Sequence, residues 1–205
     1  MLDDNCWRGE KVFVVGGGES KAALDLSRMR EHRVIACNVA AFEVACDVAV
    51  ALDRRVFDRY KAAWSALDAA GREMIYVNAN WGGGDRFPGF VRELPASRDH
   101  AWTETLADGA LLFSNTGLTA LHLAYLAGAA EIVLVGFDLV ATGKLTTGAL
   151  YPENEKTDAK ATYQKFAEAF TRYAPRLKSR RVVNVNASSA IRDFEFGDYE
   201  KECRA

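Results

Sequence analysis

The sequence predicts an α/β fold, with a doubly wound, mainly parallel sheet flanked by helices. Three observations support this prediction. Six short segments have the composition of strands, helical patterns alternate with them, and two long polar or glycine-rich stretches directly follow strands. The 205 residues fit a single domain, 1–205, because one hydrophobic core can serve chains of up to roughly 250 residues.

The strand-like segments are short and rich in β-branched residues, and most are apolar on both faces. Strands with this composition belong to a sheet whose two faces are both covered by helices. The predicted strands are residues 11–15, 33–37, 47–52, 73–77, 131–135 and 181–185.

The helical segments carry apolar residues at three- and four-residue spacing. The third is apolar nearly all round and reaches Gly128, a residue type that commonly ends helices. The predicted helices are residues 19–30, 54–70, 116–129 and 160–177.

Two long stretches interrupt this alternation, residues 78–104 and 138–160. The first is glycine-rich and aromatic, and the second is polar. Each follows a strand, so we expect two long loops at the carboxyl edge of the sheet. Insertions of this length in a compact domain are typical of functional loops.

The charge and cysteine pattern narrows the class of protein. Lys and Arg number 26 against 28 Asp and Glu, a formal charge of −2, so no global field favours nucleic acid or anionic lipid. The four cysteines are scattered and indicate reduced thiols. The sequence shows no secretion signal and no membrane-spanning run, and we expect a cytoplasmic protein without a membrane segment.

Three consecutive glycines, Gly16 to Gly18, follow the first predicted strand. Ligands of parallel α/β sheets bind beyond the carboxyl ends of strands, and glycine lets a ligand approach the backbone. The spacing does not match a dinucleotide fingerprint, because Lys21 stands where the third glycine belongs, and the G-K-[ST] of a Walker loop is absent. Ser20 is expected either to cap the following helix or to contact a ligand.

Two motifs together resemble a known group of proteins. The first is "GGGES" with the following "ALDLSRM" and a strand that ends at Asn38. The second is "SNTGLTALHLAYLAGAAEIVLVGFDL", residues 114–139. In this order they resemble the MptE-like (DUF115) proteins and the sialyltransferases of glycosyltransferase family 42, and the short chain is similar to phage-type members of that group.

The resemblance implies a Rossmann-like domain that binds a cytidine-type nucleotide across two turns. It implies that the first turn approaches phosphate and ribose, that Asn38 bonds sugar or base, and that the second turn lies against the same ligand. The implied binding residues are Gly16, Gly17, Gly18, Glu19, Ser20, Asn38, Asn115, Thr116 and Gly117.

Two acids, Asp138 and Asp53, stand at strand ends, either as loop or cap acids or as groups that bind hydroxyls or a divalent metal or transfer protons. The family-42 enzymes use a C-terminal histidine as base, and this chain has no histidine after His122. His100 is therefore the remaining loop histidine to consider as a base. Tyr151 is the candidate for a lid tyrosine that assists departure of the phosphate.

The sequence favours a transferase that uses a nucleotide-activated donor, with a CMP-sugar as the substrate implied by the resemblance. One alternative is a diphosphotransferase that resembles the pterin pyrophosphokinases and holds Mg²⁺ through Asp53 and Asp138. Another is a nucleotide-binding protein without catalysis. The acceptor is left open between a glycan, a small molecule and a modified nucleic acid, as is the formation of a homo-oligomer.

Overall fold

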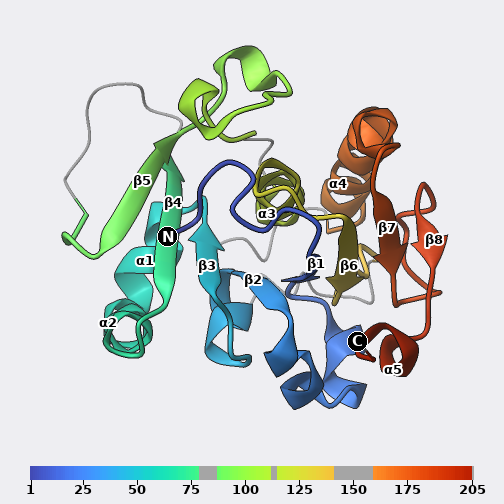
Figure 1. Ribbon diagram of the computed structural model, residues 1–205, viewed down its shortest axis with the longest axis horizontal. Helices are drawn as coiled ribbons and strands as arrows, with labels where there is room; N and C mark the ends of the chain where they lie inside the picture. Colours follow the sequence, from blue (N-terminus) through green and yellow to red (C-terminus); the bar gives the residue numbers. More distant parts are fainter. Residues whose placement is uncertain (79–86, 112–114, 141–158, 205) are drawn as a thin grey trace.

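The computed structural model describes residues 1–78, 87–111, 115–140 and 159–204. Their strands form one sheet in the order β5-β4-β3-β2-β1-β6-β7-β8, and every neighbouring pair is parallel (Figure 1). The predicted α/β fold class is confirmed. The strands are β1 (Lys11–Val15), β2 (Arg33–Cys37), β3 (Val48–Ala51), β4 (Glu73–Asn78), β5 (Val91–Pro95), β6 (Glu131–Val135), β7 (Arg181–Asn184) and β8 (Glu195–Phe196).

The order of the strands reverses next to β1. Strands β2 to β5 continue on one side of it, whereas β6 to β8 continue on the other side. Val15, the last residue of β1, pairs with Ala36 of β2 and with Val135 of β6. The carboxyl ends of these three strands therefore meet at the topological switch point, where ligands of open α/β sheets bind.

Both faces of the sheet are covered, as the doubly apolar strands predict. Val12 and Val14 belong to one core cluster with α3 (Thr116–Leu126) and α4 (Ala159–Tyr173). Phe13 and Val15 face the opposite cluster, which includes residues of α1 (Arg54–Arg59), α2 (Lys61–Ala69) and α5 (Tyr199–Glu202). Figure 1 shows α3 and α4 above the sheet and α2 and α5 below it.

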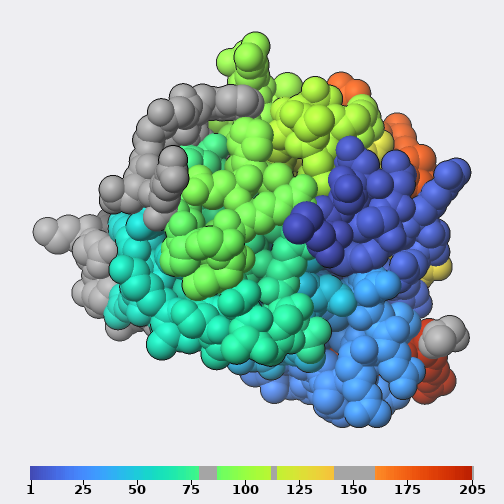
Figure 2. All heavy atoms as spheres, turned by 60° about the vertical axis from the view of Figure 1, so that its left-hand side comes forward, coloured from blue at the N-terminus to red at the C-terminus, as the bar shows by residue number. Residues whose placement is uncertain are grey.

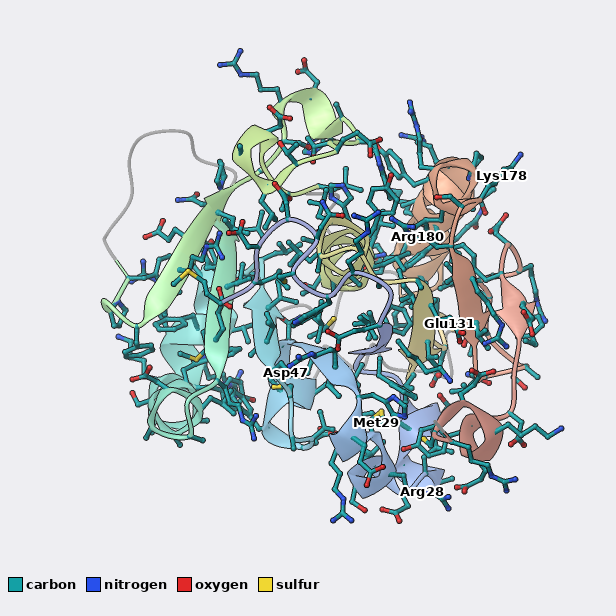
Figure 3. All side chains as sticks on the ribbon, in the orientation of Figure 1. Arg28, Met29, Asp47, Glu131, Lys178 and Arg180 are labelled. Atoms are coloured by element: carbon teal, nitrogen blue, oxygen red, sulfur yellow. The ribbon has the colours of Figure 1, made fainter. Side chains whose placement is uncertain are left out.

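The prediction of one continuous helix over residues 19–30 is wrong. The chain instead forms two 3₁₀ segments, η1 (Glu19–Ala23) and η2 (Leu26–Glu31), separated by the extended Leu24. Asp25 causes the break, because its side chain accepts a hydrogen bond from the Ser27 amide and starts a new segment. Met29 still reaches the core, and Figure 3 shows it below the sheet with its neighbour Arg28. A further 3₁₀ segment, η3 (Asn38–Phe42), follows β2.

The other predicted helices are close to the observed ones. The predicted helix 54–70 is divided into α1 and α2 at Tyr60, whose ψ of 30° leaves the helical region. Helix α3 ends at Leu126, and Gly128 adopts a positive φ of 86° just beyond it, as the predicted cap requires.

The stretch 78–104 was predicted as a loop without regular structure, and this is wrong for its second half. It contributes β5, which pairs with β4, and η4 (Arg98–His100). The sequence did not indicate this strand because Arg92 and Glu93 interrupt its apolar pattern. An edge strand tolerates such polar residues, whereas a buried strand does not. The N-terminal residues lie beside this region (Figure 2), with the Leu106 amide donating to the Asp4 carboxylate over 2.9 Å.

The last part of the chain was not predicted. Strand β8 and helix α5 close the sheet beside β7, and Arg181 forms ion pairs with Glu195 of β8, with Glu202 of α5 and with Glu131 of β6. Figure 3 shows Glu131 beside β6 and β7. Two further 3₁₀ segments of the described residues are η5 (Leu106–Asp108) and η8 (Ala174–Leu177). None of the helices in the described ranges has both the length and the hydropathy to cross a bilayer.

Candidate functional site

The two predicted turns meet at the switch point, on either side of one aromatic ring. A Cβ added at Gly16, after β1, would lie 3.2 Å from a ring carbon of Phe137, and a Cβ added at Gly117, in α3, would clash with the same ring. Phe137 follows β6. The turn after β1 and the start of α3, distant in the sequence, therefore converge at one edge of the sheet.

The three glycines of the first turn differ in the space that surrounds them. Gly18 donates its amide to the Gly136 carbonyl over 2.8 Å, and an added Cβ would clash with that carbonyl and with Asp138. Gly17 is exposed, with open space where a Cβ would stand. Gly16 and Gly18 therefore allow two turns to pack closely, whereas Gly17 exposes bare backbone at the surface.

Asp138, which follows β6, forms hydrogen bonds with the first turn and with the segment after β7. Its carboxylate accepts hydrogen bonds from the Ser20 amide over 3.0 Å, from the Ser20 hydroxyl, and from the Asn186 side-chain amide over 2.7 Å. Both carboxylate oxygens are thus engaged by the first turn and by the segment after β7. Ser20 binds Asp138 and lies within η1, so it does not cap that segment.

Asn38 links the end of β2 to the second turn. It has a φ of 50°, and its side-chain amide donates to the Thr116 hydroxyl over 3.2 Å. Its Oδ1 atom is buried and has no hydrogen-bond partner. This acceptor atom can therefore take one further hydrogen bond.

Asn115 caps α3 and leaves a donor atom unpaired. Its Oδ1 accepts from the amides of Gly117 and Leu118 over 3.0 and 3.3 Å, while its Nδ2 is buried without a partner. Asn115 therefore occupies two of the amide donors at the start of α3.

Asp53 lies at the same edge, beyond β3, and acts as a helix cap. Its carboxylate accepts from the Arg55 amide over 2.8 Å and forms an ion pair with the Arg55 guanidinium over 2.8 Å. Three inter-strand steps of about 4.8 Å, or roughly 14 Å in all, separate β3 from β6, so Asp53 and Asp138 do not share one ion. In the described ranges, no three His, Cys, Asp or Glu side chains form a metal cluster.

The structure does not bring the histidines to this edge. The His100 carbonyl accepts from the Tyr173 hydroxyl over 2.6 Å, and Tyr173 ends α4 just before the chain enters β7. His122 is a core residue whose Nδ1 accepts from the Leu111 amide over 3.0 Å. Burial lowers the pKa of His122 to about 4. His32 precedes β2 and contacts the ring of Phe13.

Two features of this edge were missed in the sequence. A groove of about 650 Å³ runs beside Asp138, between Leu139, Ala190 and the polar face of α4 that carries Tyr163 and Gln164. Lys21 lies buried directly under the first turn. The predicted lid residue Tyr151 and most of the second long loop fall outside the described residues.

The fold is similar to that of solved glycosyltransferases. Structures of the sialyltransferase CstII from Campylobacter jejuni, one of them with the substrate analogue CMP-3FNeuAc, share 17% identity and a TM-score of 0.50 over 91% of this chain and 85% of theirs. The MAf glycosyltransferase from Magnetospirillum magneticum AMB-1 shares 15% identity and a TM-score of 0.57 over 98% of this chain. This chain covers 35% of that protein.

No protein-family model and no curated protein matches the sequence. The class that the comparisons define is therefore one of fold: this chain has a glycosyltransferase-like α/β fold. The sequence motifs that resemble family 42 occupy the switch-point edge of that fold.

Proposed function

We propose that this protein transfers a glycosyl group from a nucleotide-activated donor, with a CMP-sugar as the donor. The observation that carries the proposal is the pair of buried, unpaired amide atoms, Asn38 Oδ1 and Asn115 Nδ2, beside the exposed Gly17 backbone. One acceptor and one donor at a strand-order reversal suit a nucleoside with both kinds of group. The CMP-containing structures of the similarly folded CstII support cytidine as the base.

In this proposal the two turns divide the donor between them. The backbone of Gly17 and Glu19 faces the phosphate and ribose, and Asn38 and Asn115 bond the nucleoside. Asp138 positions the first turn through Ser20. The groove beside Asp138 is open to the acceptor, whose class as a glycan is supported by the trisaccharide acceptor in a CstII structure.

The reaction forms a bond from the acceptor oxygen to the anomeric carbon of the sugar, while the bond from that carbon to the phosphate oxygen breaks. The electron pair leaves with the nucleotide, and the acceptor proton passes to a base. Since the three histidines lie elsewhere, we assign this proton to a carboxylate, with Asp138, which adjoins the groove, and Asp53 as the candidates at this edge. The role of Tyr151 in phosphate departure stays a prediction.

Thermal stabilisation by a panel of nucleotides tests the proposal. CMP, CDP, UDP, GDP, ATP and their sugars are compared with and without magnesium, because a ligand at about a hundred times its Kd adds roughly 2.7 kcal/mol to the free energy of unfolding. We expect cytidine nucleotides to give the largest shift. Equal shifts for all nucleotides, or none, would contradict the proposed donor.

Product formation separates the proposal from its alternatives. Release of CMP from CMP-N-acetylneuraminic acid without magnesium supports glycosyl transfer. Strict magnesium dependence with release of AMP from ATP would indicate a diphosphotransferase, and nucleotide binding without any product would indicate a binding protein.

A further inference from the structure

We propose that Lys21 is the cation that recognises the donor phosphate, and that Glu43 competes for Lys21 when no donor is bound. This inference rests on the proposed function. It begins from a lack of positive charge, because the predicted binding residues include no cation, whereas every nucleotide donor carries anionic phosphate. The site as predicted therefore lacks the group that phosphate most needs.

Lys21 is fixed directly beneath the first turn. Its Nζ lies 3.4 Å from the Gly18 carbonyl oxygen and 3.0 Å from a carboxylate oxygen of Glu43. The side chain is only 11% exposed, and its aliphatic part packs beside Gly136, where an added Cβ would lie 3.3 Å from Lys21 Cδ. A lysine held in this way loses little further conformational entropy when it binds a ligand.

The position of Lys21 makes its charge effective. A charge pair at a partly buried site interacts more strongly than one in bulk water, since the effective dielectric constant is lower. Three backbone amides at this edge already have partners, because Asn115 accepts from those of Gly117 and Leu118 and Asp138 accepts from that of Ser20. Lys21 is the described cation that contacts the first turn.

Glu43 is a partner that phosphate can replace. Its side chain is 47% exposed, so its carboxylate returns to water at little cost, and exposed ion pairs contribute little stability. Glu43 directly follows η3, the segment that begins with Asn38. A 3₁₀ segment of five residues spans about 10 Å. A ligand that extends from Asn38 toward the glycine turn therefore reaches the Lys21–Glu43 pair.

The arginines at the edge are committed elsewhere. Arg55 pairs with Asp53, and Arg54 pairs with Asp58 and lies over the Phe87 ring. They follow β3, two inter-strand steps or about 10 Å from β1. They are thus too far from the first turn to serve as its cation, whereas Lys21 lies next to the glycines.

Isothermal titration with CMP and with cytidine tests the proposal, because these probes differ only in the phosphate. In Lys21→Met we expect CMP affinity to fall about tenfold or more while cytidine affinity is unchanged. In Glu43→Gln we expect CMP affinity to rise about threefold, since the competing carboxylate is gone. Lys61→Met and Glu31→Gln make the same charge changes at exposed positions and should leave both affinities unchanged.

The outcomes separate this inference from the proposed function. Wild-type protein that does not bind CMP would overturn both. CMP binding with an unchanged CMP-to-cytidine ratio in Lys21→Met would overturn the role of Lys21 alone. If Lys21→Met does not fold, as circular dichroism would show, an unchanged or lowered ratio in Glu43→Gln would have the same meaning.

Discussion

Arg181 at the amino edge of the sheet and two asparagines at its carboxyl edge differ in how fully their polar atoms are paired. At the amino edge, Arg181 is paired with three carboxylates, and its hydrogen bonds to Glu202 raise its pKa. At the carboxyl edge, Asn38 and Asn115 each bury a polar atom without a partner. The pairs of Arg181 stabilise the fold, whereas the unpaired atoms of the two asparagines cost stability and leave room for the ligand bonds proposed above.

The largest expected effect concerns His122, a fully paired residue in the core between the two edges. The pKa of His122 is lowered to about 4 from 6.5, so between these pH values the unfolded chain binds a proton that the native chain does not. The free energy of unfolding should therefore fall as the pH drops from 6.5 to 4, by roughly 3 kcal/mol from this residue.

The measurement is urea unfolding at several pH values, compared with His122→Gln. Glutamine can accept from the Leu111 amide and donate to the Thr103 carbonyl, as His122 does, without titrating. The acid slope should be shallower in this variant. Equal slopes in the two proteins would show that His122 is not the source.

The second prediction separates two neighbouring glycines of the carboxyl edge. Gly18→Ala forces a Cβ against the Gly136 carbonyl and Asp138, which should destabilise the protein by about 1–3 kcal/mol. Gly17→Ala has open space and should keep its melting temperature, yet bind CMP more weakly because the new methyl group covers the backbone. A loss of stability in Gly17→Ala equal to that in Gly18→Ala would contradict the distinction.

At the amino edge, Arg181→Met should lower stability without affecting the ligand. It leaves Glu202, whose side chain is 8% exposed, without its main partner. Because Arg181 itself is 38% exposed, we expect a loss of about 2 kcal/mol, below the usual range for a fully buried pair. CMP affinity, measured below the melting transition, should be unchanged. Weakened CMP binding in this variant would show that the two edges are coupled.

The smallest expected effect concerns Asp138. In Asp138→Asn, one carboxylate oxygen becomes an NH₂ group facing donors, which should lower stability by about 1 kcal/mol. If Asp138 positions the turn, KM for the CMP-sugar rises several-fold while kcat and its pH profile are kept, and Ser20→Ala behaves alike. A fall in kcat of about a hundredfold or more, with a changed pH profile, would mark Asp138 as the base instead.

Much of the fold could be predicted because it depends on local patterns. The buried strands and α3 were found from β-branched and apolar runs, and the glycine turn from its place after β1. Strand β5 was missed because Arg92 and Glu93 break the apolar pattern at a sheet edge. The 3₁₀ form of residues 19–31 depends on a hydrogen bond from the Ser27 amide to Asp25, which periodicity does not reveal.

The candidate site was predicted only in part. The convergence of Gly16 and Gly117 on Phe137 follows from their motifs, but the partners of each polar group depend on tertiary contacts. Asp138 was predicted either as a loop or cap acid or as a group that acts on a ligand, and its bonds to Ser20 and Asn186 come from segments distant in the sequence. Lys21 was noted only as a mismatch to a glycine fingerprint, because its ion pair with Glu43 comes from a separate segment.

Hydrogen exchange with and without CMP tests the central claim most directly, that two turns distant in the chain hold one nucleotide. We predict that saturating CMP slows amide exchange in both residues 16–20 and residues 115–118, at the same CMP concentration, and leaves residues 181–184 unchanged. Protection of only one turn, or of neither, would contradict the claim.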